Sequence, residues 1–269
     1  MQIELHGAPA YAYTGGKAFD PLLNTVVFIH GAQNDHSVWA LQSRYLAHHG
    51  YSVLAVDLPG HGRSPGPALA SVEAMADWVI ALLQAAGVQR AILAGHSMGS
   101  LIALEAVQRA PALVLGLAPL GSTYPMKVSD ALLESARSDE AAAIDMVNIW
   151  SHSSIAHKPS CLGPGFSVMG GARRLMQRMS ARNPDQLFFT DFSACNSYAN
   201  GEHAAAAVQC PVLFVFGKKD MMTPPRSTTL LTGVLAHGKI VTVDAGHQLM
   251  SEAPDAVLDA LAGFAATID

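Results

Sequence analysis

The stretch Ala91-Ile-Leu-Ala-Gly-His-Ser97-Met-Gly-Ser-Leu-Ile-Ala-Leu-Glu-Ala-Val107 decides the fold of this protein. Its first four residues are apolar and predict a buried β-strand over Ala91–Ala94. After Ser97, apolar side chains recur at helical spacing and predict a helix over residues 98–110. A serine within the pattern Gly-x-Ser-x-Gly therefore stands on a sharp turn between a strand and a helix. In this context a serine can act as a nucleophile.

Other short apolar runs predict further strands, and helical patterns separate them. The predicted strands are Thr25–Ile29, Ser52–Val56, Leu113–Leu117, Val212–Phe216 and Ile240–Val243. The helical patterns cover residues 38–49, 72–86, 226–236 and 254–268. Continuously apolar strands are typical of a parallel sheet with helices on both faces. The alternation predicts an α/β fold with a doubly wound, mostly parallel sheet, edged by a hairpin of Ile3–Leu5 and Tyr11–Tyr13.

The alternation is interrupted between about residues 121 and 207. Helical patterns over Asp130–Trp150 and Ala172–Arg182 follow one another there without a clear strand, and the Gly- and Pro-rich segment Pro159–Gly171 is predicted to link them. We therefore expect residues 1–120 and 208–269 to form the core. Residues 121–207 are expected to form a helical cap over the carboxyl edge of the sheet.

The composition is that of a globular protein, with 269 residues of which 50% are hydrophobic and 14% are charged. The net charge of −5 argues against nucleic acid or an anionic membrane as the partner. No apolar run predicts a membrane span, and the first residues predict no signal peptide. The cysteines Cys161, Cys195 and Cys210 form no C-x-x-C pair. We expect a cytoplasmic protein that binds a small molecule, and the sequence leaves a homodimer open.

A second Gly-x-Ser-x-Gly match surrounds Ser64, at Gly62–Gly66. The residue that follows a nucleophilic serine of this kind must donate its backbone N–H to an oxyanion. Met98 can make that donation, whereas Pro65 has no N–H. Ser64 is therefore predicted to be a loop serine. Taken alone, Ser97 could equally be a helix-capping serine.

A second oxyanion donor is predicted at the end of the first central strand. The strand Val26–Ile29 runs directly into His30-Gly31. Such a turn lets the next backbone N–H face the serine, and we select that of Ala32, with Gln33 as the second choice. His30-Gly31 could also do no more than end the strand.

An acid and a base follow later strands, in the chain order Ser97, Asp220, His247. Asp220 lies just past a buried strand, at the sheet edge where open α/β folds place functional groups. His247 follows the last strand, and this order of serine, acid and histidine is the order of one hydrolase architecture. Alone, Asp220 could be a turn residue, and His247 is one of 12 histidines, which are usually structural.

Together these motifs resemble the α/β-hydrolase superfamily, specifically its small, capped, esterase-like branch. The matching segments are His30-Gly31, Asp57–Ser64, Gly95–Gly99, Gly217–Asp220 and Gly246-His247. The resemblance implies acyl transfer, with Ser97 as the nucleophile, His247 as the general base and Asp220 as the acid that orients His247. The N–H groups of Met98 and Ala32 would hold the oxyanion.

The reaction that such a triad performs is left open by the sequence. Similar proteins hydrolyse esters, cleave carbon–carbon bonds of ring-fission products, open lactones or make peracids without a cofactor. A ligand receptor that keeps the fold is the alternative from another class. We expect no cofactor and no metal, because His30, Asp35 and His36 lie in a loop that offers no fixed ligand face.

Apolar residues crowd both catalytic loops. Met221 follows the proposed acid, Leu249 lies two positions after the proposed base, and the insertion contains Trp150. With His30 and Gln33, these residues are the candidates for the substrate pocket. A mostly apolar pocket under a cap predicts a small, predominantly apolar substrate.

Overall fold

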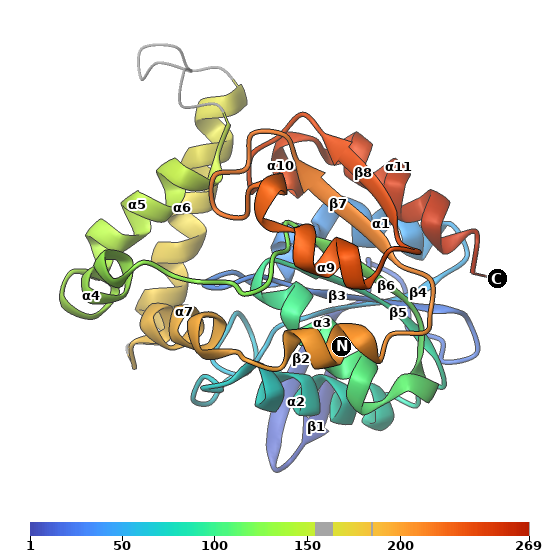
Figure 1. The fold of residues 1–269 in the computed structure, drawn as a ribbon. Helices are drawn as coiled ribbons and strands as arrows, with labels where there is room; N and C mark the ends of the chain where they lie inside the picture. Colours follow the sequence, from blue (N-terminus) through green and yellow to red (C-terminus); the bar gives the residue numbers. More distant parts are fainter. Residues whose placement is uncertain (154–163, 184, 269) are drawn as a thin grey trace.

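A computed structural model describes residues 1–153, 164–183 and 185–268. Eight strands form one sheet in the order β1-β2-β4-β3-β5-β6-β7-β8 (Figure 1). The strands from β3 to β8 run parallel, and β1 and β2 form the antiparallel hairpin expected at the edge. This confirms the doubly wound α/β fold. The strands are β1 (Gln2–Leu5), β2 (Ala8–Tyr13), β3 (Thr25–Ile29), β4 (Ser52–Val56), β5 (Ala91–His96), β6 (Val114–Leu120), β7 (Leu213–Gly217) and β8 (Lys239–Val243).

The central strands are buried on both faces because their side chains alternate between two apolar layers. In β3, Val27 and Ile29 pack into one layer, and Val26 and Phe28 pack into the other. The first layer is covered by α2 (Val72–Ala85), α3 (Met98–Arg109), α8 (Gly201–Ala206) and α9 (Thr229–Val234). The second is covered by α1 (Ala40–His48), α10 (Leu249–Glu252) and α11 (Pro254–Ala265).

Several predicted boundaries differ from those observed, and local turn chemistry explains most differences. The helix expected over residues 38–49 begins as the 3₁₀ turn η1 (His36–Trp39), because the Asp35 side chain accepts from Ser37 N and caps it. The strand expected at Leu113 begins at Val114, after the 3₁₀ turn η2 (Pro111–Leu113), and continues to Leu120. The helix expected over 226–236 is only the short α9, preceded by η3 (Pro225–Ser227).

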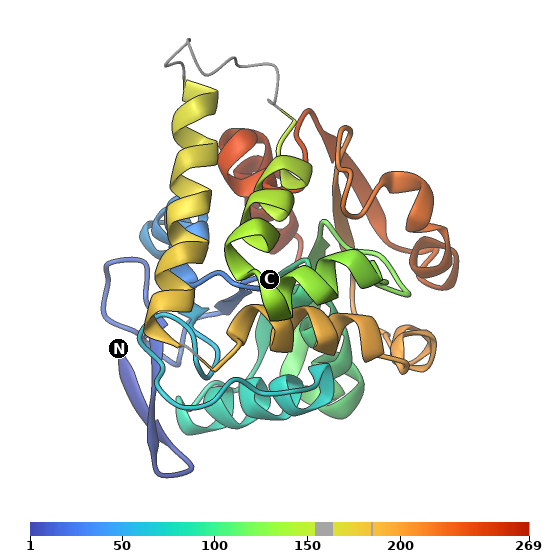
Figure 2. The ribbon, with the colours of Figure 1, turned by 90° about the vertical axis from the view of Figure 1, so that its left-hand side faces the viewer.

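In the described residues between β6 and β7 there are five helices, and four of them stand together beside the carboxyl edge of the sheet (Figures 1 and 2). These four are α4 (Asp130–Ser138), α5 (Glu140–Ser151), α6 (Pro164–Arg182) and α7 (Leu187–Ser197). They share a separate apolar cluster made of Leu132, Ala136, Ala143, Ile144, Val147, Met176, Phe188 and Phe192. The fifth helix, α8, packs its Ala204 and Ala205 into the first apolar layer, which also contains α2 and α3.

Two expectations for the insertion were wrong in detail. The single helix expected over Asp130–Trp150 is two helices, because the Asp139 side chain accepts from Ala142 N at 3.1 Å and begins α5 anew. The linker expected over Pro159–Gly171 is helical from Pro164 onward, since a proline is tolerated in a first helical turn. The earlier part of that linker, with Cys161, lies outside the described residues. Among the described helices, none has the length and apolarity that a membrane span needs.

Candidate active site

Ser97 stands on a strained turn between β5 and α3. Its backbone has φ +52° and ψ −119°, a conformation that L residues rarely adopt. The turn is possible because its neighbours are glycines: a Cβ on Gly95 would lie 2.1 Å from Gly99 O, and one on Gly99 would lie 2.3 Å from Ile29 O. Such strain is typical of functional sites, where it presents a side chain outward.

His247 and Asp220 form a buried pair at the carboxyl ends of β8 and β7. His247 Nδ1 lies 2.8 Å from Asp220 Oδ2, and both side chains are almost fully buried. The other carboxylate oxygen of Asp220 accepts from the backbone N–H groups of Met222 and Thr223, each at 2.8 Å. A carboxylate held on three sides in this way orients an imidazole ring and fixes its proton on Nδ1.

The environment of Asp220 favours its charged form. Burial opposes ionisation, but the nearby His247 ring and the hydrogen bonds from Thr223 outweigh it and hold the pKa of Asp220 well below its ordinary value. Thr223 Oγ1 donates to Asp220 Oδ2 at 2.7 Å and lies 3.2 Å from His247 Nδ1. The sequence analysis missed Thr223, although an aspartate three positions before a threonine is a pattern for local hydrogen bonds.

Two contacts hold the backbone that carries His247. The His96 ring donates from Nε2 to the carbonyl of His247 at 2.8 Å, and burial lowers the pKa of His96 to about 3, so this ring is neutral. The backbone N–H of His247 donates to the carbonyl of Ser151, the last residue of α5, at 2.8 Å. The loop of the candidate base is therefore anchored both to the elbow and to the insertion.

The structure separates the two candidates for the second oxyanion donor. The N–H of Gln33 donates to Asp191 Oδ2 at 2.7 Å and is not free for a ligand. Ala32, one position earlier, lines the same cavity as Ser97, and no acceptor for its N–H is found among the described residues. Met98 is the first residue of α3, where a backbone N–H has no partner within the helix. Ala32 and Met98 thus remain the donors that can serve an oxyanion.

Ser97 and His247 open into one cavity of about 330 Å³, under the insertion. This is near the lower limit of about 300 Å³ for small-molecule sites. Of the pocket residues expected from the sequence, Trp150 and Met221 line it. Its other lining residues are Ala32, Met126, Lys127, Val128, Ser129, Leu132, Phe192, Cys195, Met222 and Thr223.

The remaining pocket candidates lie elsewhere. His30, Gln33 and Leu249 are completely buried and are not among the residues that line this cavity. His30 Nδ1 lies 2.8 Å from Gly31 O, while its Nε2 accepts from Leu58 N at 3.2 Å, so His30 supports the loop behind the site. Leu249 packs in the apolar layer that also contains α11.

A second cavity, of about 480 Å³, is lined by residues of η1, α6 and α10, and Ser97 is not among them. A small space of about 20 Å³ beside Ser97 and His247 shares Asn34 and Gln248 with it. The second cavity is lined by apolar side chains, such as Leu175 and Met250, as well as by polar ones, including Arg174 and Arg178 on α6. The small space therefore connects the surroundings of Ser97 to the second cavity.

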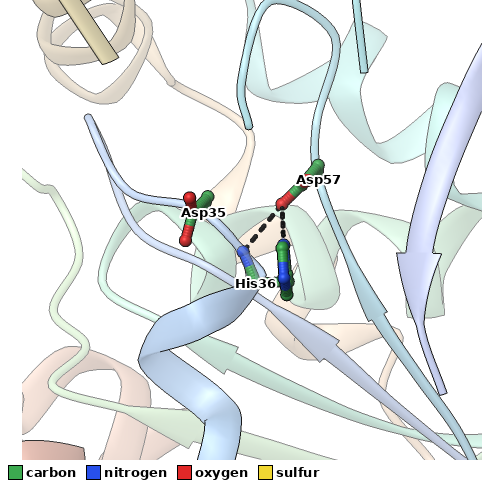
Figure 3. A group of neighbouring side chains, drawn as sticks. All are labelled: Asp35, His36 and Asp57. Carbon is green, nitrogen blue, oxygen red and sulfur yellow. Dashed lines mark hydrogen bonds and ion pairs between the residues drawn. The ribbon is translucent and has the colours of Figure 1, made fainter. Parts of the chain in front are cut away.

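Asp35, His36 and Asp57 gather within 4.8 Å of one another, so the fold adds Asp57 to the loop considered for a metal (Figure 3). Their carboxylate oxygens and His36 Nδ1 already have partners. Asp57 Oδ1 accepts from His36 N at 2.7 Å and lies 2.8 Å from His36 Nδ1. Asp35 accepts from Ser37 N and from Arg178. Through these bonds, the cluster links the oxyanion loop to the loop after β4.

Comparison with known proteins agrees with this geometry. The model of the alpha/beta hydrolase family matches residues 26–260. The chain is 25% identical over 250 residues to (E)-2-((N-methylformamido)methylene)succinate hydrolase of Acinetobacter baylyi, covering 90% of each chain. It is 28% identical over 247 residues to the pimeloyl-[acyl-carrier protein] methyl ester esterase of Neisseria meningitidis, covering 85% of this chain and 88% of that protein. The chain spans about half the length of several other curated relatives.

A solved structure supports the fold across the whole chain. The enol-lactonase from Burkholderia xenovorans LB400 superposes with a TM-score of 0.85 at 20% identity, covering 99% of this chain and 100% of that one. With a family model that matches most of its length, and with a serine elbow at the position that the fold requires, this chain belongs to the alpha/beta hydrolase family and is a hydrolase.

Proposed function

We propose that this protein is a serine hydrolase that cleaves an ester or related acyl bond of a small, mostly apolar substrate. The observation that carries the proposal is the 2.8 Å contact between His247 Nδ1 and Asp220 Oδ2 beside a cavity that also contains the strained Ser97. The pair leaves His247 Nε2 as the nitrogen that can accept the proton of Ser97.

The reaction follows from these positions. Ser97 Oγ attacks the carbonyl carbon while its proton passes to His247 Nε2, and the oxyanion accepts from the N–H groups of Met98 and Ala32. The carbon–oxygen bond to the alcohol then breaks, and the alcohol leaves with the proton from His247. Water attacks the acyl-enzyme, gives a proton to His247 and releases the acid, after which Ser97 recovers its proton. Asp220 stays ionised throughout and stabilises the charged imidazole.

The size and lining of the cavity beside Ser97 support a small, mostly apolar substrate. The 330 Å³ cavity, with Trp150, Phe192 and Met222 on its walls, fits a small apolar group. Because this space is limited, a long acyl chain would not fit.

Other bonds remain alternatives on the same triad. The names of similar proteins, a methyl ester esterase and an enol-lactonase, favour esters and lactones over carbon–carbon bonds and peracids. A receptor that retains the fold would bind a ligand in the same cavity without rapid turnover. We propose a cytoplasmic location and a small molecule as the partner of this hydrolase.

The test is labelling by a fluorophosphonate together with turnover of p-nitrophenyl butyrate. The wild-type protein should be labelled at Ser97 only, and Ser97→Ala should lose both labelling and at least 10³-fold of the turnover, roughly as triad members do. Ser64→Ala is the matched control and should retain activity, because Ser64 accepts from Tyr11 N at 2.9 Å as a structural serine. A Ser97→Ala protein that keeps more than about a tenth of the activity would contradict the proposal.

His247→Ala gives an independent test of the base. Serine is a weak nucleophile without a base, so labelling of Ser97 should slow greatly in this variant. Labelling at the wild-type rate would remove His247 from the reaction. Lactones and ring-fission diketones, assayed beside the ester, would identify the preferred bond.

A further inference from the structure

One buried carboxylate of the insertion has no role in the reaction just described. Asp191 of α7 is completely buried, and its Oδ2 accepts from two groups of the core: Gln33 N at 2.7 Å and His61 Nε2 at 2.9 Å. Gln33 directly follows Ala32, the proposed oxyanion donor. Asp191 therefore reaches from the insertion to the loop on which the oxyanion site depends.

The partner of this carboxylate is a charged histidine. His61 Nδ1 lies 3.1 Å from Pro59 O, and Nε2 faces the Asp191 carboxylate. A backbone carbonyl and an ionised carboxylate both accept hydrogen bonds, so this geometry favours a ring with a proton on each nitrogen. Burial opposes that charge, but Asp191 outweighs it and raises the pKa of His61. In contrast, burial and the charge of His61 lower the pKa of the adjacent His30 to about 4.

Two further helices of the insertion also accept hydrogen bonds from this loop. The Gln33 backbone is in the left-handed region, with φ +58°. Its side-chain amide donates to Ser180 Oγ at 2.7 Å and to Met176 O at 3.2 Å, both on α6, and to Glu140 Oε1 at 3.2 Å, on α5. A glutamine in that conformation persists only where its surroundings hold it. Here its surroundings belong to the insertion.

We propose that Asp191 and His61 are positioning residues that hold the loop of Ala32, so that the insertion sets the oxyanion site and does more than cover the pocket. This inference rests on the proposed function, because it names what orients one of its donors. A buried ion pair is weak evidence for stability, since an apolar pair of similar volume often serves equally well. What an apolar pair could not supply is an acceptor for the Gln33 N–H.

The geometry predicts how the loop responds when the acceptor changes. In Asp191→Asn, the amide oxygen can still accept from Gln33 N and His61, but the charge that balances the imidazolium is lost. In Asp191→Ala, the Gln33 N–H has no acceptor and the turn is free to relax. The defect should therefore be graded, with the asparagine variant between the wild type and the alanine variant.

Two measurements test this inference. Steady-state kinetics on p-nitrophenyl butyrate should show kcat lowered about tenfold in Asp191→Asn and about 100-fold in Asp191→Ala, with KM changed less than about threefold, because the oxyanion forms only after binding. Hydrogen exchange should show faster exchange of the Gln33 amide in both variants. Asp145→Asn is the matched control, since Asp145 is also on an insertion helix but its partner Arg173 is half exposed. The control should leave kcat and exchange unchanged.

The outcomes separate this inference from the proposed function. Wild-type exchange at the Gln33 amide in a folded Asp191→Asn protein would overturn the positioning role, whatever the activity. A kcat within twofold of wild type in Asp191→Ala would also overturn it. Absence of labelling and turnover in the wild-type protein would instead overturn the proposed serine chemistry. If the alanine variant does not fold, the asparagine variant supplies both measurements.

Discussion

Replacing Asp220 by asparagine should disable the proposed base with almost no change in shape. The structure determines how the new amide must lie. The oxygen at the Oδ1 position faces two backbone N–H groups, of Met222 and Thr223, at 2.8 Å each. The asparagine must keep its carbonyl oxygen there, so its NH₂ group faces His247 Nδ1, where Oδ2 lay at 2.8 Å.

This orientation reverses the tautomer of the imidazole. An NH₂ group cannot accept the Nδ1 proton, so His247 must accept at Nδ1 and carry its proton on Nε2, the nitrogen that should take the proton of Ser97. A triad in the wrong tautomer loses about 10⁴ in kcat, which corresponds to about 5 kcal/mol of transition-state stabilisation. The KM should change little, because the pocket walls are untouched.

The assay is kcat and KM for p-nitrophenyl butyrate, together with the rate of fluorophosphonate labelling at Ser97. Asp244→Asn is the matched control: Asp244 lies in the loop after β8 and pairs with Lys219 at the surface, 69% exposed. It should behave as wild type. A loss of kcat smaller than about tenfold in a folded Asp220→Asn protein would refute the reasoning, because the local hydrogen bonds allow no other amide orientation.

Three further predictions concern the pocket, the insertion and acid stability. Across p-nitrophenyl acetate, butyrate, hexanoate and decanoate, kcat/KM should first rise, by an amount equivalent to at most about 0.8 kcal/mol of binding free energy per methylene, and then fall. Trp150→Ala should move the optimum to longer chains, and a maximum at acetate would contradict an enclosed apolar pocket. Phe188→Ala should lower the free energy of unfolding by about 3–5 kcal/mol, because Phe188 is completely buried and stacks on Phe192 at 4.6 Å, and a loss under about 1 kcal/mol in urea titration would be inconsistent with that packing. Since folding lowers the pKa of Asp220, the contribution of its charge to stability is complete above the unfolded pKa of about 4 and is lost as pH falls further. Asp220→Asn should therefore lose less stability than the wild type between pH 5 and pH 2, and equal losses in the two proteins would exclude a stabilising role for the Asp220 charge.

The sequence alone predicted the fold class of the core and the chain order of its candidate catalytic residues. Strands buried on both faces read as continuous apolar runs, which is why β3 and β4 were predicted with the bounds observed. The elbow was equally readable from its Gly-x-Ser-x-Gly pattern; Gly95 is required by a close contact with Gly99 O within the turn, and Gly99 by a close contact with Ile29 O of β3. Pro65 excluded the competing serine for a reason that is also local, its missing N–H.

Contacts between residues far apart in the chain were decided only by the tertiary structure. The pairing of Asp191 with His61, 130 residues away, has no periodic pattern in sequence, and neither has the burial of His30 and Leu249 away from the pocket. The sequence had already selected Ala32 before Gln33 as oxyanion donor, but the bond from Gln33 N to Asp191 is seen only in the tertiary structure. Turns and apolar periodicity depend on residues that are neighbours in the chain, so they can be predicted from the sequence. Hydrogen bonds between the insertion and the core depend on how these two parts pack together after folding.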